Sequence, residues 1–386
     1  MADPVLLLVH ALAPPTPGGT PVILHRLLSG LDACRVDVVT DRSLAGRVRA
    51  GGPLVLPGRY RYVPKLPAPP ARRLQGAFAY ANALLAVGAG ARAALAARSR
   101  DTRWVLSVVD GGFSPIAGAL AARLSGRPHL LMAFDLWDEN AYSPAERRLG
   151  RMLERRIVQR AAAVVVYCEK AAEHYRAKHG ARCEVIPTPI DLPAEPVSAP
   201  AAAADPGELL VAGAVYWAQE DAVRRLVRAA GLVEGATVTI LGDEADLRRR
   251  GIHAGRYEPA LAAEAFRDRL RRAGVLFLGL SFGSPYPDVI RTATPARLVE
   301  YMAAGRPLLV HAPRGSHVAE YARSLDFAEV VDSADDEALA AGLRAVIGDP
   351  ERALERARRA RELATERHAA PVVRRRFREL LEQLAG

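Results

Sequence analysis

The sequence predicts an α/β protein with two doubly wound domains in tandem, and three observations indicate this fold class. Short, continuous apolar runs alternate with amphipathic segments of helix length, a pattern typical of parallel sheets covered by helices on both faces. The alternation is interrupted by a stretch rich in Pro and Ala at 193–207, and then begins again. The chain of 386 residues is also long enough for two hydrophobic cores.

The part of the chain before this stretch contains six candidate strands. Each is a short apolar run bounded by turn residues and followed by a candidate helix or loop. These runs are 4–10, 35–40, 104–109, 129–134, 163–167 and 183–187. Strands and helices that alternate in this way form a Rossmann-like domain, which we expect to span residues 1–192.

The part after the stretch repeats the pattern. Its candidate strands are 208–213, 236–242, 274–280, 307–311 and 328–332, separated by helices that include 219–231 and 260–273. We therefore expect a second Rossmann-like domain at 208–365, joined to the first by a linker at 193–207. Residues 366–386 are expected to form a C-terminal helix that crosses back to the first domain. Ligands are expected in the cleft between the two facing domains.

Composition and charge restrict the function only in part. The formal net charge of +10, with 53 Lys and Arg against 43 Asp and Glu, suits nucleic acid, acidic lipid or phosphorylated substrates. The sequence has no zinc-ligand spacing and no recognisable nucleic-acid module, so we expect no nucleic-acid partner. Three dispersed cysteines and an N-terminus without a basic leader indicate a cytoplasmic location. The apolar segment 74–91 contains Gln75 and Asn82, which favours a packed helix over a membrane span.

A Gly-Gly turn precedes the first candidate helix. Gly18 and Gly19 allow a tight turn and close approach to a ligand, while Thr20 suits an N-cap and Pro21 the first helical position. Free amides at such a helix start favour an anion by about 0.3 to 1 kcal/mol. Two glycines before a helix are also ordinary turn chemistry, so an anion-binding loop and a plain turn both remain open.

The segment 292–313 contains a second helix start and a pair of charges. We expect Thr294 at the N-cap and Pro295 at the first helical position. Arg297 and Glu300 are three residues apart and share one face of the helix, which permits an intrahelical ion pair. The alternative is ligand binding, because an arginine suits phosphate oxygens and a carboxylate accepts hydrogen bonds from two ribose hydroxyls. A nucleoside diphosphate would use both.

A family resemblance starts from this segment. The pattern Thr-Pro-x-Arg-x-x-Glu-Tyr-Met-x-x-Gly-x-Pro, from Thr294 to Pro307, resembles the nucleotide-sugar signature of the family 4 glycosyltransferases. The order of the other segments agrees, including FDLWDEN at 134–140, CEVIPTPID ending at Asp191 and LLVAGAVYW at 209–217. The resemblance extends over nearly the whole chain. It implies the GT-B architecture, two Rossmann-like domains facing across a cleft, and sugar transfer from a nucleotide-diphosphate donor with retention of configuration. It implies no metal ion and no cofactor besides the donor.

The resemblance also implies roles for individual residues. Glu300 would hold the donor ribose, and Arg297 would stand in the position of a phosphate-binding lysine. Gly18 and Gly19 would approach the donor phosphates or the acceptor. The other expected donor-site residues are Gly213, Arg256, Tyr257, Arg291, Thr292, Thr294 and Pro295, with Arg256 and Tyr257 in a loop that borders the base.

The sequence departs from the family at several positions. Thr292 lies eight residues before Glu300, where the family often has a glutamate assigned to the transferred sugar. A basic residue usual after Gly213 is missing, and Arg291 or Arg297 would replace it. Asp135 follows a buried strand, so we expect it to be catalytic together with Arg297 and Glu300, near the acceptor hydroxyl or the transferred sugar. The resemblance is therefore that of a divergent member.

The main hypothesis is a metal-independent, retaining transferase of hexosyl or related sugars. Its acceptor would be a hydroxyl of a glycan, a lipid-linked compound or a small molecule. A nucleotide-sugar epimerase or hydrolase of the same fold and a non-catalytic nucleotide-sugar-binding protein are the alternatives. The positive net charge also allows peripheral contact with an acidic membrane at its inner face.

Overall fold

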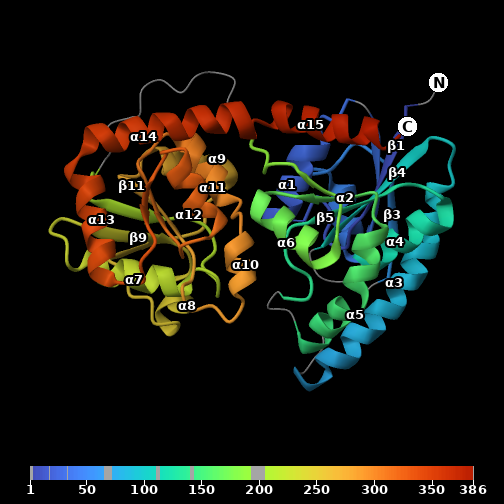
Figure 1. Ribbon diagram of the computed structural model, residues 1–386, viewed down its shortest axis with the longest axis horizontal. Coiled ribbons are helices and arrows are strands. Elements are labelled where there is room, and N and C mark those ends of the chain that lie inside the picture. Colours follow the sequence, from blue (N-terminus) through green and yellow to red (C-terminus); the bar gives the residue numbers. More distant parts are fainter. Residues whose placement is uncertain are drawn as a thin grey trace. The chain divides into compact units, whose positions relative to one another are not determined.

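The computed structural model describes residues 3–16, 18–32, 34–64, 72–109, 114–139, 143–192 and 205–385. Most of the linker at 193–207 and Asn140, at the end of the segment 134–140, lie outside these residues. The chain divides into two compact units. The first comprises Met1–Pro189 and Ala370–Gly386, and the second comprises Ile190–Ala369. Each unit is an α/β domain with its own sheet (Figure 1).

The first unit is built on a seven-stranded parallel sheet with strand order β3-β2-β1-β4-β5-β6-β7. Its strands are β1 (Val5–Val9), β2 (Arg35–Asp41), β3 (Tyr60–Val63), β4 (Thr102–Val109), β5 (His129–Ala133), β6 (Ala163–Val166) and β7 (Cys183–Val185). Its helices are α1 (Gly19–Leu28), η1 (Arg42–Leu44), α2 (Ala45–Ala50), η2 (Arg72–Leu74), α3 (Gln75–Ala97), α4 (Ser114–Ser125), α5 (Pro144–Arg160), α6 (Glu169–His179) and α15 (Ala370–Gln383). The strand order reverses between β1 and β4, which makes this the topological switch point.

Helices cover both faces of the first sheet. Leu7 and Val105 share a core cluster with buried alanines of α3 and α4. Successive side chains of a strand point to opposite faces, so Trp104 lies on the other face. There its indole Nε1 donates a hydrogen bond of 3.0 Å to the carbonyl of Leu381 in α15. The C-terminal helix is therefore part of the first unit's hydrophobic core.

The second unit is built on a six-stranded parallel sheet with strand order β10-β9-β8-β11-β12-β13. Its strands are β8 (Glu208–Val211), β9 (Thr237–Leu241), β10 (Arg256–Glu258), β11 (Val275–Gly279), β12 (Leu308–His311) and β13 (Glu329–Val331). Its helices are α7 (Glu220–Ala230), α8 (Glu244–Arg249), α9 (Ala263–Arg271), α10 (Pro287–Thr292), α11 (Arg297–Ala304), α12 (His317–Ser324), α13 (Asp336–Gly348), α14 (Pro350–Leu363) and the π-helical turn η3 (Ala364–His368). One buried cluster packs α9 to α12 against the sheet, and a second packs α7, α8 and α13 against its other face.

The predicted fold class, two doubly wound α/β domains in tandem, is confirmed. The sequence patterns missed two strands, β3 and β10, and both lie at the edges of their sheets. Their residues are mostly half-exposed and polar, for example Arg61 and Arg256. An edge strand pairs on one side only and needs no continuous apolar run, so hydrophobic patterning does not reveal it.

Candidate functional site

A pocket of about 400 Å³ opens in the second unit at the carboxyl ends of three neighbouring strands. Its walls come from the loops after β8, β9 and β10, and from helices α8 and α9. The lining residues are Gly213, Ala214, Val215, Leu241, Gly242, Asp243, Asp246, Leu247, Arg250, Ala260, Leu261 and Phe266. Doubly wound sheets bind ligands at this edge, so the pocket is where the fold predicts a site. Of the predicted site residues, Gly213 lines it.

Arg297 extends from α11 to the loop that forms one wall of this pocket. Its guanidinium donates a hydrogen bond to the carbonyl of Ala214. A Cβ placed on Gly213 would come within 3.4 Å of the Arg297 Cζ, so the guanidinium rests against the bare glycine backbone. Gly213 also has a φ of 91°, a conformation that side chains rarely adopt. The structure therefore brings two predicted site residues, Gly213 and Arg297, into contact.

Tyr301 holds the backbone just before the same loop through two hydrogen bonds. Its side chain is fully buried. The phenol oxygen accepts a hydrogen bond of 2.9 Å from the amide of Ala212 and donates one of 3.0 Å to the carbonyl of that residue. Burial raises the pKa of the Tyr301 phenol, and the positive charge of Arg297 opposes that shift. Tyr301 is part of the motif from Thr294 to Pro307, but the sequence predicted no role for it.

Helix α11 begins later than the sequence predicted. Its first residue is Arg297, with Ala296 at the N-cap, so the assignments of Thr294 to the N-cap and Pro295 to the first helical position are wrong. The residues just before α11 form a turn, in which the amide of Leu298 donates a hydrogen bond of 2.9 Å to the carbonyl of Pro295. The hydroxyl oxygen of Thr294 is buried and has no hydrogen-bond partner within the described residues.

Glu300 lies on the half-exposed face of α11, one turn after Arg297. The opposite face of the helix is buried in the core through Leu298, Val299, Tyr301 and Met302. This explains how a helix next to the core carries two charged residues. The hydrophobic face anchors α11 to the sheet, while the arginine extends to the β8 loop and the glutamate is left at the surface of the unit.

Arg291 and Thr292 both make contacts within α10. Arg291 forms an ion pair with Asp288, in which Nε and Oδ1 are 3.0 Å apart. The Thr292 hydroxyl donates a hydrogen bond of 2.8 Å to the carbonyl of Asp288. The threonine hydroxyl therefore bonds to the backbone of its own helix, at the position where the family often has a glutamate.

The sequence predicted a loop at Arg256 and Tyr257, and this prediction is wrong. They belong to the edge strand β10 and do not line the pocket. The Tyr257 hydroxyl donates to the carbonyl of Ile252 and accepts from the amide of Ala254, both at 2.8 Å, and so closes the turn before its own strand. The pocket wall next to β10 is formed by Ala260 and Leu261 instead. Ala260 and Leu261 have neither a charge nor an aromatic ring, so the sequence does not mark them as site residues.

An aromatic group follows the pocket wall and was also missed. Tyr216 and Trp217 continue the β8 loop, and the Trp217 ring packs edge-on against Tyr286 with centroids 5.3 Å apart. Tyr216 is 48% exposed.

The loop after β11 is held by Asp221, whose carboxylate accepts a hydrogen bond of 2.8 Å from the amide of Phe282. Burial acts to raise the pKa of Asp221, but this amide and Arg225 hold it below its ordinary value.

The Gly-Gly turn of the first unit forms the start of α1. The helix begins at Gly19 with Gly18 as N-cap, so the assignments of Thr20 to the N-cap and Pro21 to the first helical position are wrong. Gly18 has a φ of 135°, which favours glycine, whereas a Cβ on Gly19 would meet no atom within 4 Å. No side-chain oxygen caps α1 at Gly18. The first amides of a helix have no partner within the helix, so those of α1 need another acceptor, which a ligand can supply.

Asp135 lies two residues after β5, in a bend that a buried network supports. The phenol of Tyr175 donates to the Asp135 carbonyl at 3.2 Å and lies 3.4 Å from Oε1 of Glu154. Lys178 donates to Asp138 at 2.6 Å and lies 3.5 Å from Glu154. Burial, together with the negative charge of Asp138, raises the pKa of Glu154 to about 7. The sequence identified Asp135 but not the network beneath it.

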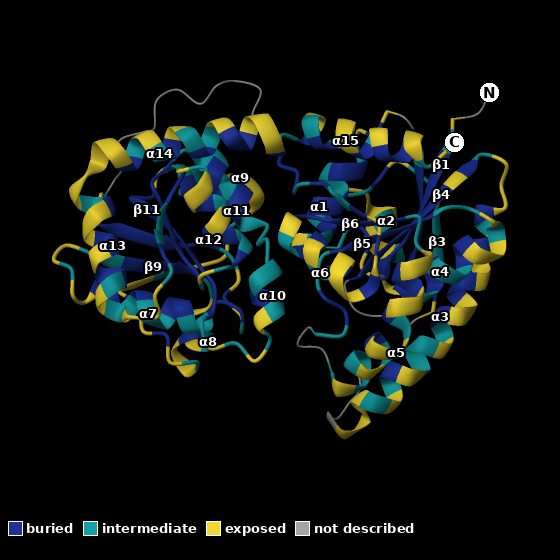
Figure 2. Cartoon of the chain, in the orientation of Figure 1, coloured by how far each residue is buried: buried dark blue, intermediate teal, exposed yellow. Residues whose placement is uncertain are grey.

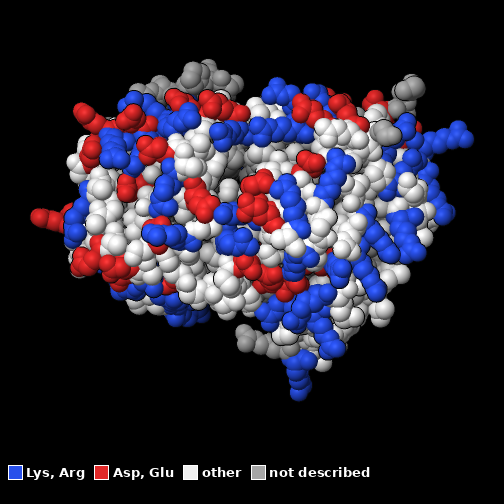
Figure 3. Space-filling view, in the orientation of Figure 1, with Lys and Arg blue, Asp and Glu red and all other residues white. Residues whose placement is uncertain are grey.

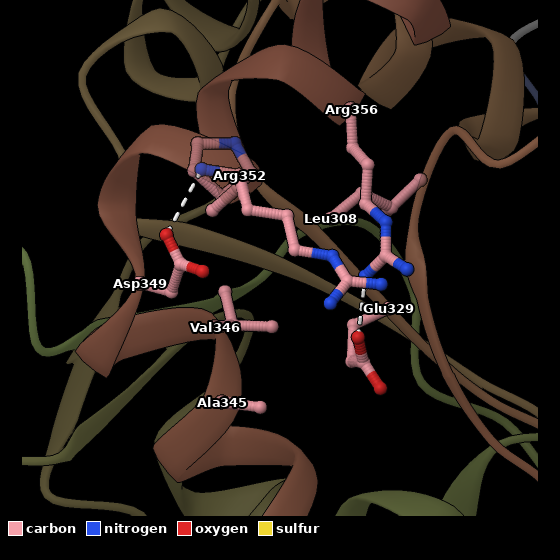
Figure 4. A pocket seen from close by; sticks show the side chains of 9 residues that line it. Leu308, Glu329, Ala345, Val346, Asp349, Arg352 and Arg356 are labelled. Carbon is pink, nitrogen blue, oxygen red and sulfur yellow. Dashed lines mark hydrogen bonds and ion pairs between the residues drawn. The ribbon is translucent and has the colours of Figure 1, made fainter.

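A second pocket, of about 140 Å³, lies at the other end of the strands of the second sheet (Figure 4). It is lined by Pro307, Leu308, Glu329, Ala345, Val346, Asp349, Arg352, Ala353 and Arg356. Arg356 forms an ion pair of 2.5 Å with Glu329 across it. Leu308 and Glu329 are the first residues of β12 and β13, so this pocket is at the amino ends of the strands, where doubly wound domains do not bind their ligands.

Comparison with known proteins agrees with this arrangement. Residues 18–189 match the family described as glycosyl transferase 4-like domain. No curated protein sequence matches the chain. Among solved structures, sucrose-phosphate synthase from Thermosynechococcus elongatus is similar in fold, with a TM-score of 0.70, 15% sequence identity and 99% of each chain covered.

Two further structures are similar at the same level. Anabaena Alr3699/HepE, solved in complex with UDP, has a TM-score of 0.67 at 15% identity, covering 98% of this chain and 100% of that chain. A glycosyltransferase from Rickettsia africae has a TM-score of 0.66 at 11% identity, covering 100% and 99%. Residues 18–189 thus match a glycosyl transferase 4-like domain, and the chain has the two Rossmann-like domains of the GT-B fold, which fits a divergent family 4-like member.

Proposed function

We propose that the chain is a retaining glycosyltransferase that moves a sugar from a nucleotide-diphosphate sugar to an acceptor hydroxyl. The acceptor belongs to a glycan, a lipid-linked compound or a small molecule, and the reaction needs no metal ion. The observation that carries the proposal is the contact between Arg297 and Gly213 at the wall of the 400 Å³ pocket. It places a permanent positive charge beside a cavity at the carboxyl ends of the strands.

Such a charge favours the chemistry of nucleotide sugars. Breaking the bond between the anomeric carbon and the diphosphate leaves negative charge on the departing oxygen and positive charge on the sugar ring. Arg297 would stabilise that oxygen, because a guanidinium binds phosphate through two parallel hydrogen bonds. Glu300, one turn further along α11, would accept hydrogen bonds from the two ribose hydroxyls.

The other predicted residues keep supporting roles in this proposal. Arg291 would add positive charge near the diphosphate on leaving Asp288, and the buried Thr294 hydroxyl would provide one more hydrogen bond. The uncapped amides of α1, next to Gly18 and Gly19, would bind the donor phosphates or the acceptor. Asp135 would act from the first unit, near the acceptor hydroxyl or the transferred sugar.

The structural neighbours suggest which donor to test first. Anabaena Alr3699/HepE was solved with UDP and with UDP-glucose. At 14–15% identity this likeness supports the donor class without fixing the sugar. A panel that starts from UDP and UDP-glucose and extends to other nucleoside diphosphates and their sugars therefore covers the proposal.

The decisive experiment measures binding of these nucleotides by calorimetry to the wild-type protein and to Glu300→Gln. We expect Glu300→Gln to weaken binding about 10- to 100-fold, because charge-assisted hydrogen bonds to ribose are lost. A 2′-deoxy nucleotide should bind the wild type more weakly but distinguish little between wild type and variant. Glu337→Gln, on the exposed surface of α13, is the matched control.

Turnover separates the proposal from its alternatives. Release of nucleoside diphosphate that depends on an acceptor, with the product anomer identified by NMR, supports a retaining transferase. Release that does not respond to any acceptor favours a hydrolase. Unchanged nucleotide binding by Glu300→Gln overturns the donor-site assignment, and tight binding with no turnover on the full panel favours a binding protein.

A further inference from the structure

Helix α3 of the first unit exposes a continuous apolar stripe. Its outer positions follow helical spacing, at intervals of three or four residues: Ala77, Tyr80, Leu84, Val87, Ala91 and Leu95. The fractional exposure is 75% for Leu84, 68% for Leu95 and 51% for Val87. At about 1.5 Å per residue the helix is about 35 Å long. Large apolar side chains aligned in this way on a surface mark an interaction site.

The inner side of α3 shows that the helix does not leave the domain. Its buried residues are alanines and glycine, which pack in the core cluster of β1, β4 and α4. A Cβ on Gly90 would come within 2.9 Å of the Leu120 side chain in α4, so the two helices are in close contact. Among the described helices, α3 is the one with the length and composition of a membrane span, yet only 28% of its most apolar window is buried. The outer side is therefore available to a partner while the inner side stays in the protein.

Arginines are abundant across α3 and the two helices that contact it. Helices α3, α4 and α5 together carry eight arginines and two glutamates. The arginines are Arg92, Arg123, Arg147, Arg148, Arg151, Arg155, Arg156 and Arg160. Of the glutamates, Glu154 is buried and Glu146 closes the capping box at the start of α5. Figure 3 shows Lys and Arg side chains dominating the surface over these helices, and Figure 2 shows exposed residues along α3 and α5.

The two other helices of this surface also expose apolar side chains. Leu124 of α4 is 46% exposed, and Met152 of α5 is 59% exposed, next in sequence to Arg151. Both helices contact α3; at its start, a Cβ on Gly76 would lie 3.8 Å from Ala145 of α5. Apolar side chains within an arginine-rich surface are the combination that binds at the interface of a lipid bilayer.

We propose that the outer face of α3, with the arginines of α4 and α5, docks on the surface of an anionic lipid bilayer. The leucines and Tyr80 enter the boundary between headgroups and acyl chains, and the arginines contact the acidic headgroups. A second copy of the chain is a poorer partner, because a symmetric dimer through this face would bring two arginine-rich surfaces together. The proposal uses only the first unit and is independent of the donor site.

Vesicle sedimentation of the full-length protein tests this surface. We expect the protein to bind vesicles of phosphatidylcholine that contain about 30% phosphatidylglycerol. Binding to vesicles of phosphatidylcholine alone should be much weaker. Raising the salt from about 50 to about 500 mM should weaken the binding, because the Debye length shortens. Leu84→Gln with Leu95→Gln, and separately Arg155→Gln with Arg156→Gln, should each lower the partition coefficient about tenfold or more.

Matched controls come from the second unit. Leu232→Gln replaces a leucine that is 46% exposed, and Arg249→Gln with Arg358→Gln removes two exposed arginines. These variants should bind vesicles like the wild type. The proposal is overturned if acidic vesicles do not sediment the protein, or if Leu84→Gln with Leu95→Gln leaves binding unchanged. It is also overturned if light scattering shows a dimer that this double variant dissociates, because the stripe is then a protein interface. Nucleotide binding by calorimetry should be the same in all these variants, which separates this test from that of the donor site.

Discussion

The guanidinium of Arg297 rests on the backbone of Gly213, whose missing side chain lets the arginine reach the carbonyl of Ala214. A methyl group at position 213 would come within 3.4 Å of the Arg297 Cζ. Gly213→Ala should therefore displace the guanidinium from the pocket wall. We expect nucleoside diphosphate binding to weaken about 10-fold or more, because the lost contact is charge-assisted.

Backbone strain must be separated from this effect, because Gly213 has a φ of 91°. Gly235→Ala provides the control, since Gly235 has a φ of 76° and a Cβ there would meet no atom within 4 Å. Both variants should lose about 1 kcal/mol of stability from the strained conformation. Only Gly213→Ala should lose affinity in calorimetry. Equal affinities for the two variants would show that the contact with Arg297 does not matter for binding.

The arginine itself gives a graded prediction. Arg297→Lys keeps the charge but loses the planar fork, so we expect nucleoside diphosphate binding to weaken about tenfold. Arg297→Ala removes the charge as well and should weaken it about a hundredfold. Arg344, which donates from an exposed position to the carbonyl of Leu232, provides Arg344→Lys as the control. If Arg297→Ala binds nucleotides as tightly as the wild type, Arg297 is a structural residue of the β8 loop.

Tyr301 and Tyr257 offer a matched pair of phenols. Each hydroxyl accepts from one backbone amide and donates to one backbone carbonyl, at 2.8 to 3.0 Å. Phenylalanine at either position leaves these groups without that partner, at a cost of about 1 to 3 kcal/mol. We expect both variants to lower the midpoint of thermal unfolding. Only Tyr301→Phe should weaken nucleotide binding, because its hydroxyl holds Ala212 next to Gly213, and equal affinities would contradict this.

The sequence predicted the fold class because buried parallel strands are continuous apolar runs, such as Leu6 to Val9. It also brought out Arg297 and Glu300, because charged residues on a helix with a buried face are unusual. Both helix starts were predicted two residues away from the observed N-caps, since Thr20 and Thr294 have the right chemistry for an N-cap but not the right backbone position. Local residue preference does not decide between neighbouring cap positions when tertiary contacts hold the chain.

The remaining site residues could not be predicted for a different reason. The pocket wall of Ala260 and Leu261 and the two hydrogen bonds of Tyr301 to Ala212 depend on which strands are neighbours in the sheet. Tyr301 and Ala212 are 89 residues apart in the sequence. No periodicity within one segment contains that information.

The network below Asp135 gives a prediction for the pH dependence of stability. Glu154 has its pKa raised to about 7, above the ordinary value of 4.5, because the carboxyl is buried and lies near Asp138. The folded state therefore holds a proton that the unfolded state releases, so this contribution is complete below pH 4.5 and is lost as pH rises to about 7. The shift, which already includes the opposing charge of Lys178, corresponds to about 3 kcal/mol at most.

Glu154→Gln replaces the carboxyl by a neutral group of the same shape. As the pH rises from about 5 to about 7.5, we expect the midpoint of thermal unfolding to decrease more for the wild type than for Glu154→Gln. The reason is that only the wild type must ionise a buried carboxyl. Glu173→Gln, on the exposed surface of α6, is the control and should follow the wild type at every pH. If the curves of wild type and Glu154→Gln are parallel, Lys178 and His179 neutralise the ionised carboxylate, and the bend at Asp135 is then held by an ion pair rather than by a protonated acid.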